Sequence, residues 1–253
     1  SSEGQKYEPE DADKVMFYRE SESGIMLEEG INEAGAFSAW LALATSYSNN
    51  NLPMIPFYIF YSMFGFQRIH DLAWAAGDSR ARGFLLGATS GRTTLNGEGL
   101  QHQDGHSHIL ASTIPNCRSY DPCYSYELSA IIQEGINDMY VNGNDKYYYI
   151  TLMNENYFHP AKPKKLKNED ILKGAYKLKE NKNINLRILA SGVTLNFALE
   201  AEKVLKDYGI NADIWSITSF NELYREGIEI ERENRLNSTS KKSYVEICFS
   251  DEI

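Results

Sequence analysis

The sequence has only three cysteines, and these are Cys117, Cys123 and Cys248. An odd number of cysteines without regular spacing argues against a small disulfide-bonded scaffold. Reduced thiols are typical of a cytoplasmic protein, so we expect that location. Residues 1–14 are polar and acidic, unlike a signal peptide. The chain also lacks an initiator Met, so we expect it to be a piece of a longer protein.

Basic residues and long hydrophobic runs are also scarce. Lysine and arginine number 25 against 35 aspartates and glutamates, which gives a net charge of −10. Binding to nucleic acid or to an anionic membrane surface needs a basic face, so we expect neither partner. A membrane-spanning helix needs about 18 or more apolar residues. The richest run, residues 52–66, is interrupted by Pro53 and Pro56.

Strand and helix patterns alternate along the first part of the chain. Apolar or β-branched runs predict strands at residues 55–60, 83–87, 110–117 and 146–152. Helical patterns cover residues 28–46, 61–76 and 124–140, and an extended piece at 24–27 follows a helical turn near 11–18. Alternation of this kind predicts an α/β fold with a mostly parallel sheet.

A change in composition separates a second unit from the first. Residues 156–170 hold two prolines and four lysines, and we interpret them as a linker over the surface. Beyond it, strands are predicted at residues 185–191, 212–218 and 244–249, with helices at 193–208 and 221–237. We expect an incomplete second α/β layer in which no helix covers the last strand.

Residues 91–108 read GRTTLNGEGLQHQDGHSH and follow a predicted buried strand. Their apolar residues follow neither the two-residue period of a strand nor the 3.6-residue period of a helix, so we predict a loop. In α/β proteins, loops at the carboxyl ends of strands are where ligands bind. His102, Asp104, His106 and His108 also resemble the spacing of metal ligands, which would suit a metal-dependent hydrolase. The alternative is that these histidines only hydrogen-bond and hold the loop.

Glu33 stands out among the acids at the start of the first predicted helix. Its neighbours one and two turns on are Ala36, Phe37 and Trp40, which place it toward the buried side. A buried carboxyl group must be paired, hydrogen-bonded or protonated. The alternative is that Glu28, Glu29 and Glu33 form a solvated face. Arg68 raises a similar question, because its burial would require an anionic partner.

Several long motifs resemble the homodimeric bacterial pyruvate dehydrogenase E1 component. They are EEGINEAG (28–35), NLPMIPFYIFYSMFGFQRIHDLAWAAGD (51–78), GFLLGATSGRTTLNGEGLQHQDGHSHI (83–109), YDPCYSYE (120–127) and YYYITLMNENY (147–157). The resemblance implies a transketolase-like α/β architecture: a pyrimidine-binding domain over residues 1–158, a linker at 159–170, and a truncated C-terminal α/β domain at 171–253. It implies decarboxylation of pyruvate with thiamin diphosphate and acetyl transfer to lipoyl groups of the E2 acyltransferase.

The resemblance also implies roles for five residues. Glu33 matches the glutamate that bonds N1′ of the cofactor's aminopyrimidine, and a raised pKa would let it share that proton. Phe64 matches the aromatic that stacks on the pyrimidine. Tyr61 and Arg68 match residues near the cofactor and substrate. His102 matches the histidine that faces pyruvate and transfers protons. By the same resemblance, His106 and His108 hold the loop and no metal ligand is expected in this chain.

The chain departs from the family pattern in one important way. The family binds Mg²⁺ and the cofactor's diphosphate through a GDG…N motif in an N-terminal domain, and only Gly77-Asp78-Ser79 is found here, in another context. We therefore expect this chain to supply only half of the residues of each active site and to have no activity in isolation. We expect a homodimer only for the full-length parent. A non-catalytic interaction or dimerisation module is the alternative.

Overall fold

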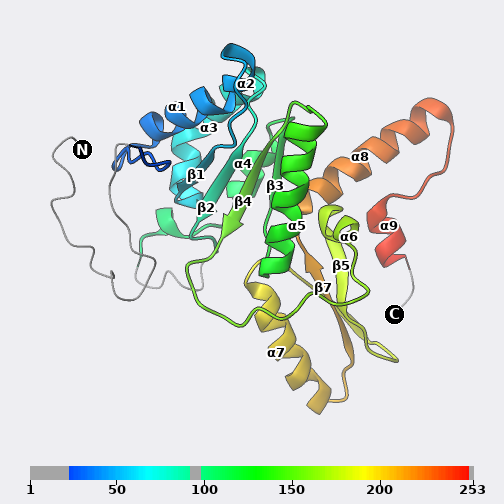
Figure 1. The fold of residues 1–253 in the computed structure, drawn as a ribbon. Helices are drawn as coiled ribbons and strands as arrows, with labels where there is room; N and C mark the ends of the chain where they lie inside the picture. Colours follow the sequence, from blue (N-terminus) through cyan, green and yellow to red (C-terminus); the bar gives the residue numbers. More distant parts are fainter. Residues whose placement is uncertain (1–22, 92–97, 251–253) are drawn as a thin grey trace.

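The computed structural model describes residues 23–91 and 98–250. Figure 1 shows two sheets that follow one another along the chain, with helices on both faces of the first. The predicted helical turn near residues 11–18 lies outside the described residues. In the described part of the chain, no helix is both long and apolar enough to cross a membrane.

The first sheet has the strand order β1-β2-β4-β3, and all of its neighbouring strands run parallel. Its strands are β1 (Phe57–Phe60), β2 (Phe84–Ala88), β3 (Cys117–Tyr120) and β4 (Tyr147–Leu152). Its helical segments are α1 (Glu33–Ala44), α2 (Ser46–Asn49), α3 (Ser62–Asp78), η1 (Leu100–His102), α4 (Ser107–Ser112), α5 (Ser125–Ile136) and the π-turn η2 (Asn137–Val141). The α/β class and the parallel sheet predicted from the sequence are confirmed.

The core has two layers, one on each face of β4. Tyr147 and Tyr149 pack with side chains of α1, α3 and α4, whereas Tyr148 and Ile150 pack with α5 on the other face. Successive residues of a strand point to opposite faces. A strand that is buried on both sides therefore reads as a continuous apolar run, as residues 147–152 do.

The second sheet has the order β5-β7-β6, with β6 parallel and β5 antiparallel to β7. Its elements are α6 (Asn168–Leu172), β5 (Ala175–Lys179), β6 (Leu186–Ala190), α7 (Thr194–Asp207), β7 (Ala212–Ile217), α8 (Phe220–Asn237) and α9 (Tyr244–Phe249). The sequence patterns did not predict β5, which is short and carries two lysines. Nor did they predict α6, which begins inside the expected linker.

The first helix begins later than residue 28, where the sequence pattern places its start. Asn32 accepts a hydrogen bond from the backbone N–H of Gly35 at 3.1 Å, so the helix starts after this cap. Glu28 and Glu29 precede the helix in an exposed segment. Of the three acids at this predicted start, only Glu33 therefore belongs to the helix. The predicted extended piece at residues 24–27 does not form a strand.

The predicted strand at residues 110–117 is also wrong. The structure has helix α4 there, and the strand β3 follows it. The carboxylate of Asp104 accepts hydrogen bonds from the backbone N–H groups of His106 and Ser107, at 3.2 and 3.0 Å, and fixes the start of α4. This capping by a residue upstream of the apolar run outweighs the strand pattern of the run itself.

The predicted last strand at residues 244–249 is helix α9. Ser243 and Glu246 form a capping box in which the backbone N–H of Ser243 donates to the Glu246 carboxylate at 2.7 Å. Phe249 packs against Trp215 of β7, with ring centroids 4.6 Å apart. The expectation of an uncovered last strand is thus wrong, because α9 itself lies against the second sheet.

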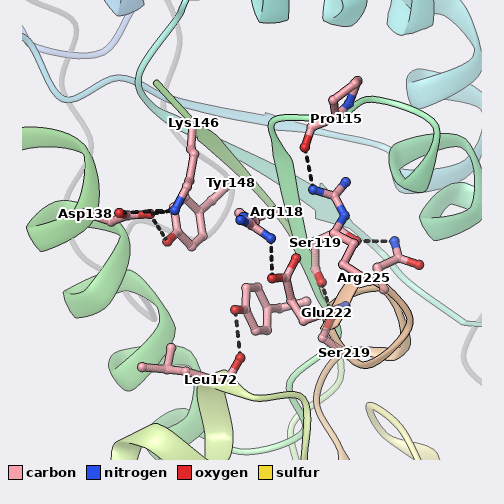
Figure 2. A network of polar contacts seen from close by, with 12 residues as sticks. Pro115, Arg118, Ser119, Asp138, Lys146, Tyr148, Leu172, Ser219, Glu222 and Arg225 are labelled. Atoms are coloured by element: carbon pink, nitrogen blue, oxygen red, sulfur yellow. Dashed lines mark hydrogen bonds and ion pairs between the residues drawn. The ribbon is translucent and has the colours of Figure 1, made fainter. Parts of the chain in front are cut away.

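Polar contacts join the two sheets through helix α8 (Figure 2). Arg118 of β3 donates to the carboxylate of Glu222 at 2.6 Å, and Arg225 donates to the carbonyl of Ile114 at 2.8 Å. Burial raises the pKa of Glu222 even though Arg118 and Arg225 oppose this. Glu222 therefore belongs to a largely buried ion pair that links β3 to α8.

A second link is the fully buried carboxylate of Glu127 on α5. It accepts hydrogen bonds from the backbone N–H groups of Cys123 and Tyr124, at 2.6 and 2.8 Å. The hydroxyls of Tyr176 on β5 and Ser216 on β7 also donate to it, each at 2.7 Å. A buried charge is tolerated when it is hydrogen-bonded this fully, so Glu127 holds the second sheet against the first.

Candidate functional site

Five side chains that the sequence singles out lie together at the carboxyl edge of the first sheet. Tyr61 directly follows β1 and precedes α3, which carries Phe64 and Arg68. His102 lies in η1, after β2, and Glu33 is the first residue of α1. Because β1 and β2 are parallel, the segments that follow them start at the same edge.

Aromatic rings form the centre of this cluster. The rings of Tyr61 and Phe64 stack with centroids 5.0 Å apart and planes 27° apart. The imidazole of His102 meets both rings edge-on, at 5.4 Å from Tyr61 and 4.9 Å from Phe64. Phe66, by contrast, is fully buried in the core.

Glu33 and Arg68 form an ion pair at the other side of Phe64. Nη1 of Arg68 lies 2.5 Å from Oε1 of Glu33, and its guanidinium carbon lies 4.4 Å from the centre of the Phe64 ring. The Glu33 side chain is 19% exposed, whereas that of Arg68 is 52% exposed. Arg68 thus has an anionic partner, although its side chain stays largely on the surface.

The electrostatics of Glu33 differ from the sequence-based expectation. Burial alone would raise the pKa of this carboxyl group, but a hydrogen bond from its own backbone N–H and the charge of Arg68 outweigh burial and lower it. The expected raised pKa is therefore wrong, because the sequence did not reveal the pairing with Arg68. Burial, and then the negative charge of Glu33, raise the pKa of neighbouring Tyr58 to about 12.

His102 has an acidic neighbour that sequence reasoning missed. Its Nδ1 lies 3.3 Å from Oε2 of Glu98, one helical turn earlier in the chain. That nitrogen is buried and has no partner with hydrogen-bond geometry. The spacing of four residues between Glu98 and His102 was the available signal, but it predicts a contact only if the segment is helical.

The other loop histidines do not join this cluster. His108 lies 2.8 Å from the Thr151 hydroxyl of β4, and the backbone of His106 bonds to Asp104. Among residues 23–91 and 98–250, no group of three or more His, Cys, Asp or Glu side chains is arranged to hold a metal ion. The metal-hydrolase alternative therefore has no set of ligands in the described loop.

Comparisons with known proteins agree on one family. The model of the pyruvate dehydrogenase E1 component middle domain matches residues 1–160, and that of the transketolase-like TK C-terminal domain matches residues 174–253. The E1 component of Pseudomonas aeruginosa is 63% identical over 98% of the chain, and that of Escherichia coli K12 is 55% identical over 99%. The chain spans 29% of the length of each of these relatives.

Solved structures show the same fold at low sequence identity. A transketolase from Campylobacter jejuni is 20% identical and has a TM-score of 0.58, covering 73% of this chain and 27% of its own. A split-gene transketolase, described as an inactive beta4 tetramer, is 20% identical with a TM-score of 0.57, covering 82% of this chain and 61% of its own. The transketolase-like architecture predicted from the sequence is thus confirmed.

Proposed function

Because the chain belongs to the pyruvate dehydrogenase E1 family, we propose that it supplies the aminopyrimidine-binding half of a thiamin diphosphate site. The observation that carries this proposal is the cluster of Glu33, Arg68 and Phe64 at the carboxyl edge of the first sheet. It offers a carboxylate beside an aromatic ring, which suits a flat, basic heterocycle. Nδ1 of His102, which is buried without a hydrogen-bond partner among the described residues, is a further polar atom beside the same rings.

Each residue has a proposed role in the decarboxylation of pyruvate. Thiamin diphosphate, when bound, supplies the electron sink that this reaction needs. Glu33, whose pKa is lowered by its own backbone N–H and by Arg68, would hold the pyrimidine ring of the cofactor through a hydrogen bond to its carboxylate and so assist proton transfer there. Phe64 stacks on the pyrimidine, and Tyr61 and Arg68 orient the substrate carboxylate. His102 hydrogen-bonds to the substrate and transfers protons.

The full reaction requires partners beyond this chain. We propose pyruvate as the substrate, the lipoyl groups of an E2 acyltransferase as acetyl acceptors, and a homodimer of full-length chains in the cytoplasm. We expect Mg²⁺ and the diphosphate to bind to residues outside this chain, as the family resemblance implies. We expect the 253 residues alone not to turn over pyruvate, even with the cofactor and Mg²⁺ added.

The test uses a chain of the relatives' full length that carries this sequence. Glu33→Gln should lower the rate at saturating cofactor by about 100-fold or more, because general acid–base catalysis contributes about that much. KM for pyruvate should change far less. Glu200→Gln, on the exposed side of α7, is the matched control and should leave the rate unchanged. An unchanged rate in the Glu33→Gln variant would show that Glu33 does not have the proposed role.

An interaction module is the second candidate, and exposed apolar side chains favour it. The edge strand β1 presents Phe57, Ile59 and the following Tyr61 with exposed fractions of 46, 67 and 47%. A groove beside it is lined by Ala36 and Ala39 of α1. We expect this chain to self-associate or to co-purify with a full-length relative. A stable monomer by analytical ultracentrifugation that captures no such relative would contradict this function.

A further inference from the structure

A second pocket, of about 390 Å³, lies where the two sheets meet. The residues around it lie near the carboxyl ends of β3 and β4 or in the segments that follow β2, β3, β6 and β7. Its lining residues are Ser90, Gly91, Asp104, Gly105, His106, His108, Ile109, Ser119, Asp121, Thr151, Ser191, Val193, Thr194, Ser219, Phe220 and Asn221. None of Glu33, Phe64 and His102 is among them, so this pocket is separate from the candidate site.

Of the two acids that line this pocket, Asp121 is the one whose carboxylate receives no backbone hydrogen bond from the described residues. The hydroxyls of Thr151 and Ser191 donate to it at 2.7 and 2.8 Å. In the described part of the chain, no lysine or arginine forms an ion pair with it. A carboxylate has about four acceptor positions, so two remain open beside the pocket. Asp104 differs, because the backbone N–H groups of His106 and Ser107 already compensate its charge.

Several hydroxyl groups around the pocket donate their protons to other protein groups and not toward the pocket. Ser219 donates to the backbone carbonyl of Ser119 at 2.6 Å, and Thr194 donates to that of Ser191 at 2.6 Å. The side-chain N–H₂ of Asn221 donates to the carbonyl of His108, at 2.8 Å, and to the hydroxyl of Ser119. Each of these hydroxyls also accepts one hydrogen bond: Ser219 from the backbone N–H of Glu222, Thr194 from that of Ser191, and Ser119 from the side chain of Asn221. One further acceptor position on each oxygen remains for a ligand.

His108 contacts the same hydroxyl group that bonds to Asp121. Its Nε2 lies 2.8 Å from Oγ1 of Thr151, which donates to the Asp121 carboxylate at 2.7 Å. A pocket with many acceptors and few donors is complementary to a donor-rich ligand.

We propose that this pocket binds a small organic cation, with an ammonium or amidinium group against Asp121. The N–H groups of the cation donate to the open positions of the carboxylate, as in other charge-assisted hydrogen bonds. Its apolar part packs against Ile109, Val193 and Phe220, which lie on three different segments of the lining. Asp121 also bonds through its backbone to Thr218 and Gly192, which follow β7 and β6 of the second sheet, at 2.8 and 3.1 Å. A bound cation therefore contacts both halves of the chain.

Three probes of one shape and different charge test the proposal on the intact chain. Benzamidine is a cation, benzamide is neutral and benzoate is an anion. We expect benzamidine to bind at least about tenfold more tightly than either analogue in an NMR titration. The shifted backbone amides should include those of Gly105 and Gly192. Equal affinities, tighter binding of benzoate, or shifts confined to the surroundings of Glu33 would each overturn the proposal.

Two variants and one control complete the test. Asp121→Asn should abolish the preference for benzamidine, whereas Asp207→Asn, on the exposed end of α7, should keep it. Ile109→Trp should block the pocket without changing Asp121, because Ile109 is 64% exposed and lines the pocket. If Asp121→Asn does not fold, Ile109→Trp decides the outcome. Benzamidine binding that survives Ile109→Trp would refute the site.

Discussion

Arg68 holds Glu33 by an ion pair of 2.5 Å between Nη1 and Oε1, and the same guanidinium covers the ring of Phe64. One surface arginine thus helps to lower the pKa of the acid and also contacts the aromatic ring. The two residues are far apart in sequence and come from α1 and α3, which pack against each other. Any ligand that bonds to Glu33 must share this carboxylate with Arg68.

Arg68→Met should raise the pKa of Glu33, because burial would then be opposed only by the backbone hydrogen bond. The folded pKa of Glu33 is lowered, so its contribution to stability is present above the unfolded value of 4.5 and is lost as pH falls through the folded value. The measurement is an NMR titration of the glutamate carboxyl carbons. Arg80→Met, whose side chain is 72% exposed, is the control. An unmoved Glu33 titration would show that Arg68 does not set its charge.

Asn32→Ala should destabilise the chain by about 1 kcal/mol, because the helix that begins with Glu33 would lose its N-terminal cap. The free energy of unfolding from urea titrations measures this. Asn237→Ala, at the last residue of α8, removes an exposed amide and should change the free energy by less than about 0.5 kcal/mol. Equal losses in the two variants would mean that the Asn32 cap contributes nothing specific.

Glu222→Gln should flatten the pH dependence of stability. The folded pKa of Glu222 is raised, so the folded state keeps its proton above pH 4.5, where the unfolded state has lost it. The contribution of Glu222 to stability therefore falls as pH rises from 4.5 through the folded pKa. Unfolding free energies across a pH series from 4.5 upward measure the slope. Glu200→Gln, an exposed acid on α7, should keep the wild-type slope. A slope unaffected by Glu222→Gln would contradict the assignment.

Gly192→Ala should cost more stability than Gly209→Ala. Both glycines have positive φ, at 53° and 74°, so each alanine should cost roughly 1 kcal/mol in backbone strain. A Cβ on Gly192 would also lie 2.7 Å from Oδ2 of Asp121, whereas one on Gly209 would meet nothing within 4 Å. The difference between the two losses in thermal or urea unfolding isolates the clash with Asp121. Equal losses would show that Asp121 moves away without cost.

Sequence patterns predicted most of the fold because the central elements are locally consistent. The apolar runs of β1, β2, β4 and β7 and the amphipathic patterns of α3, α7 and α8 each indicate their own structure. The wrong predictions concern short segments whose secondary structure depends on helix caps. Helix α4 depends on Asp104, and α9 on the Ser243 and Glu246 capping box, whose sequence signal was available but not used. The domain boundaries at 1–158, 159–170 and 171–253 stay a prediction.

The sequence by itself determined the fold class, the family and the residue types of the candidate site, because motifs and periodicity are local properties of the chain. Only the tertiary structure decided the charge state of Glu33, since its partner Arg68 comes from another helix. It likewise decided the pocket around Asp121, because segments of both sheets meet there. The physical reason is that electrostatic interactions depend on distance in space, whereas sequence patterns record distance along the chain.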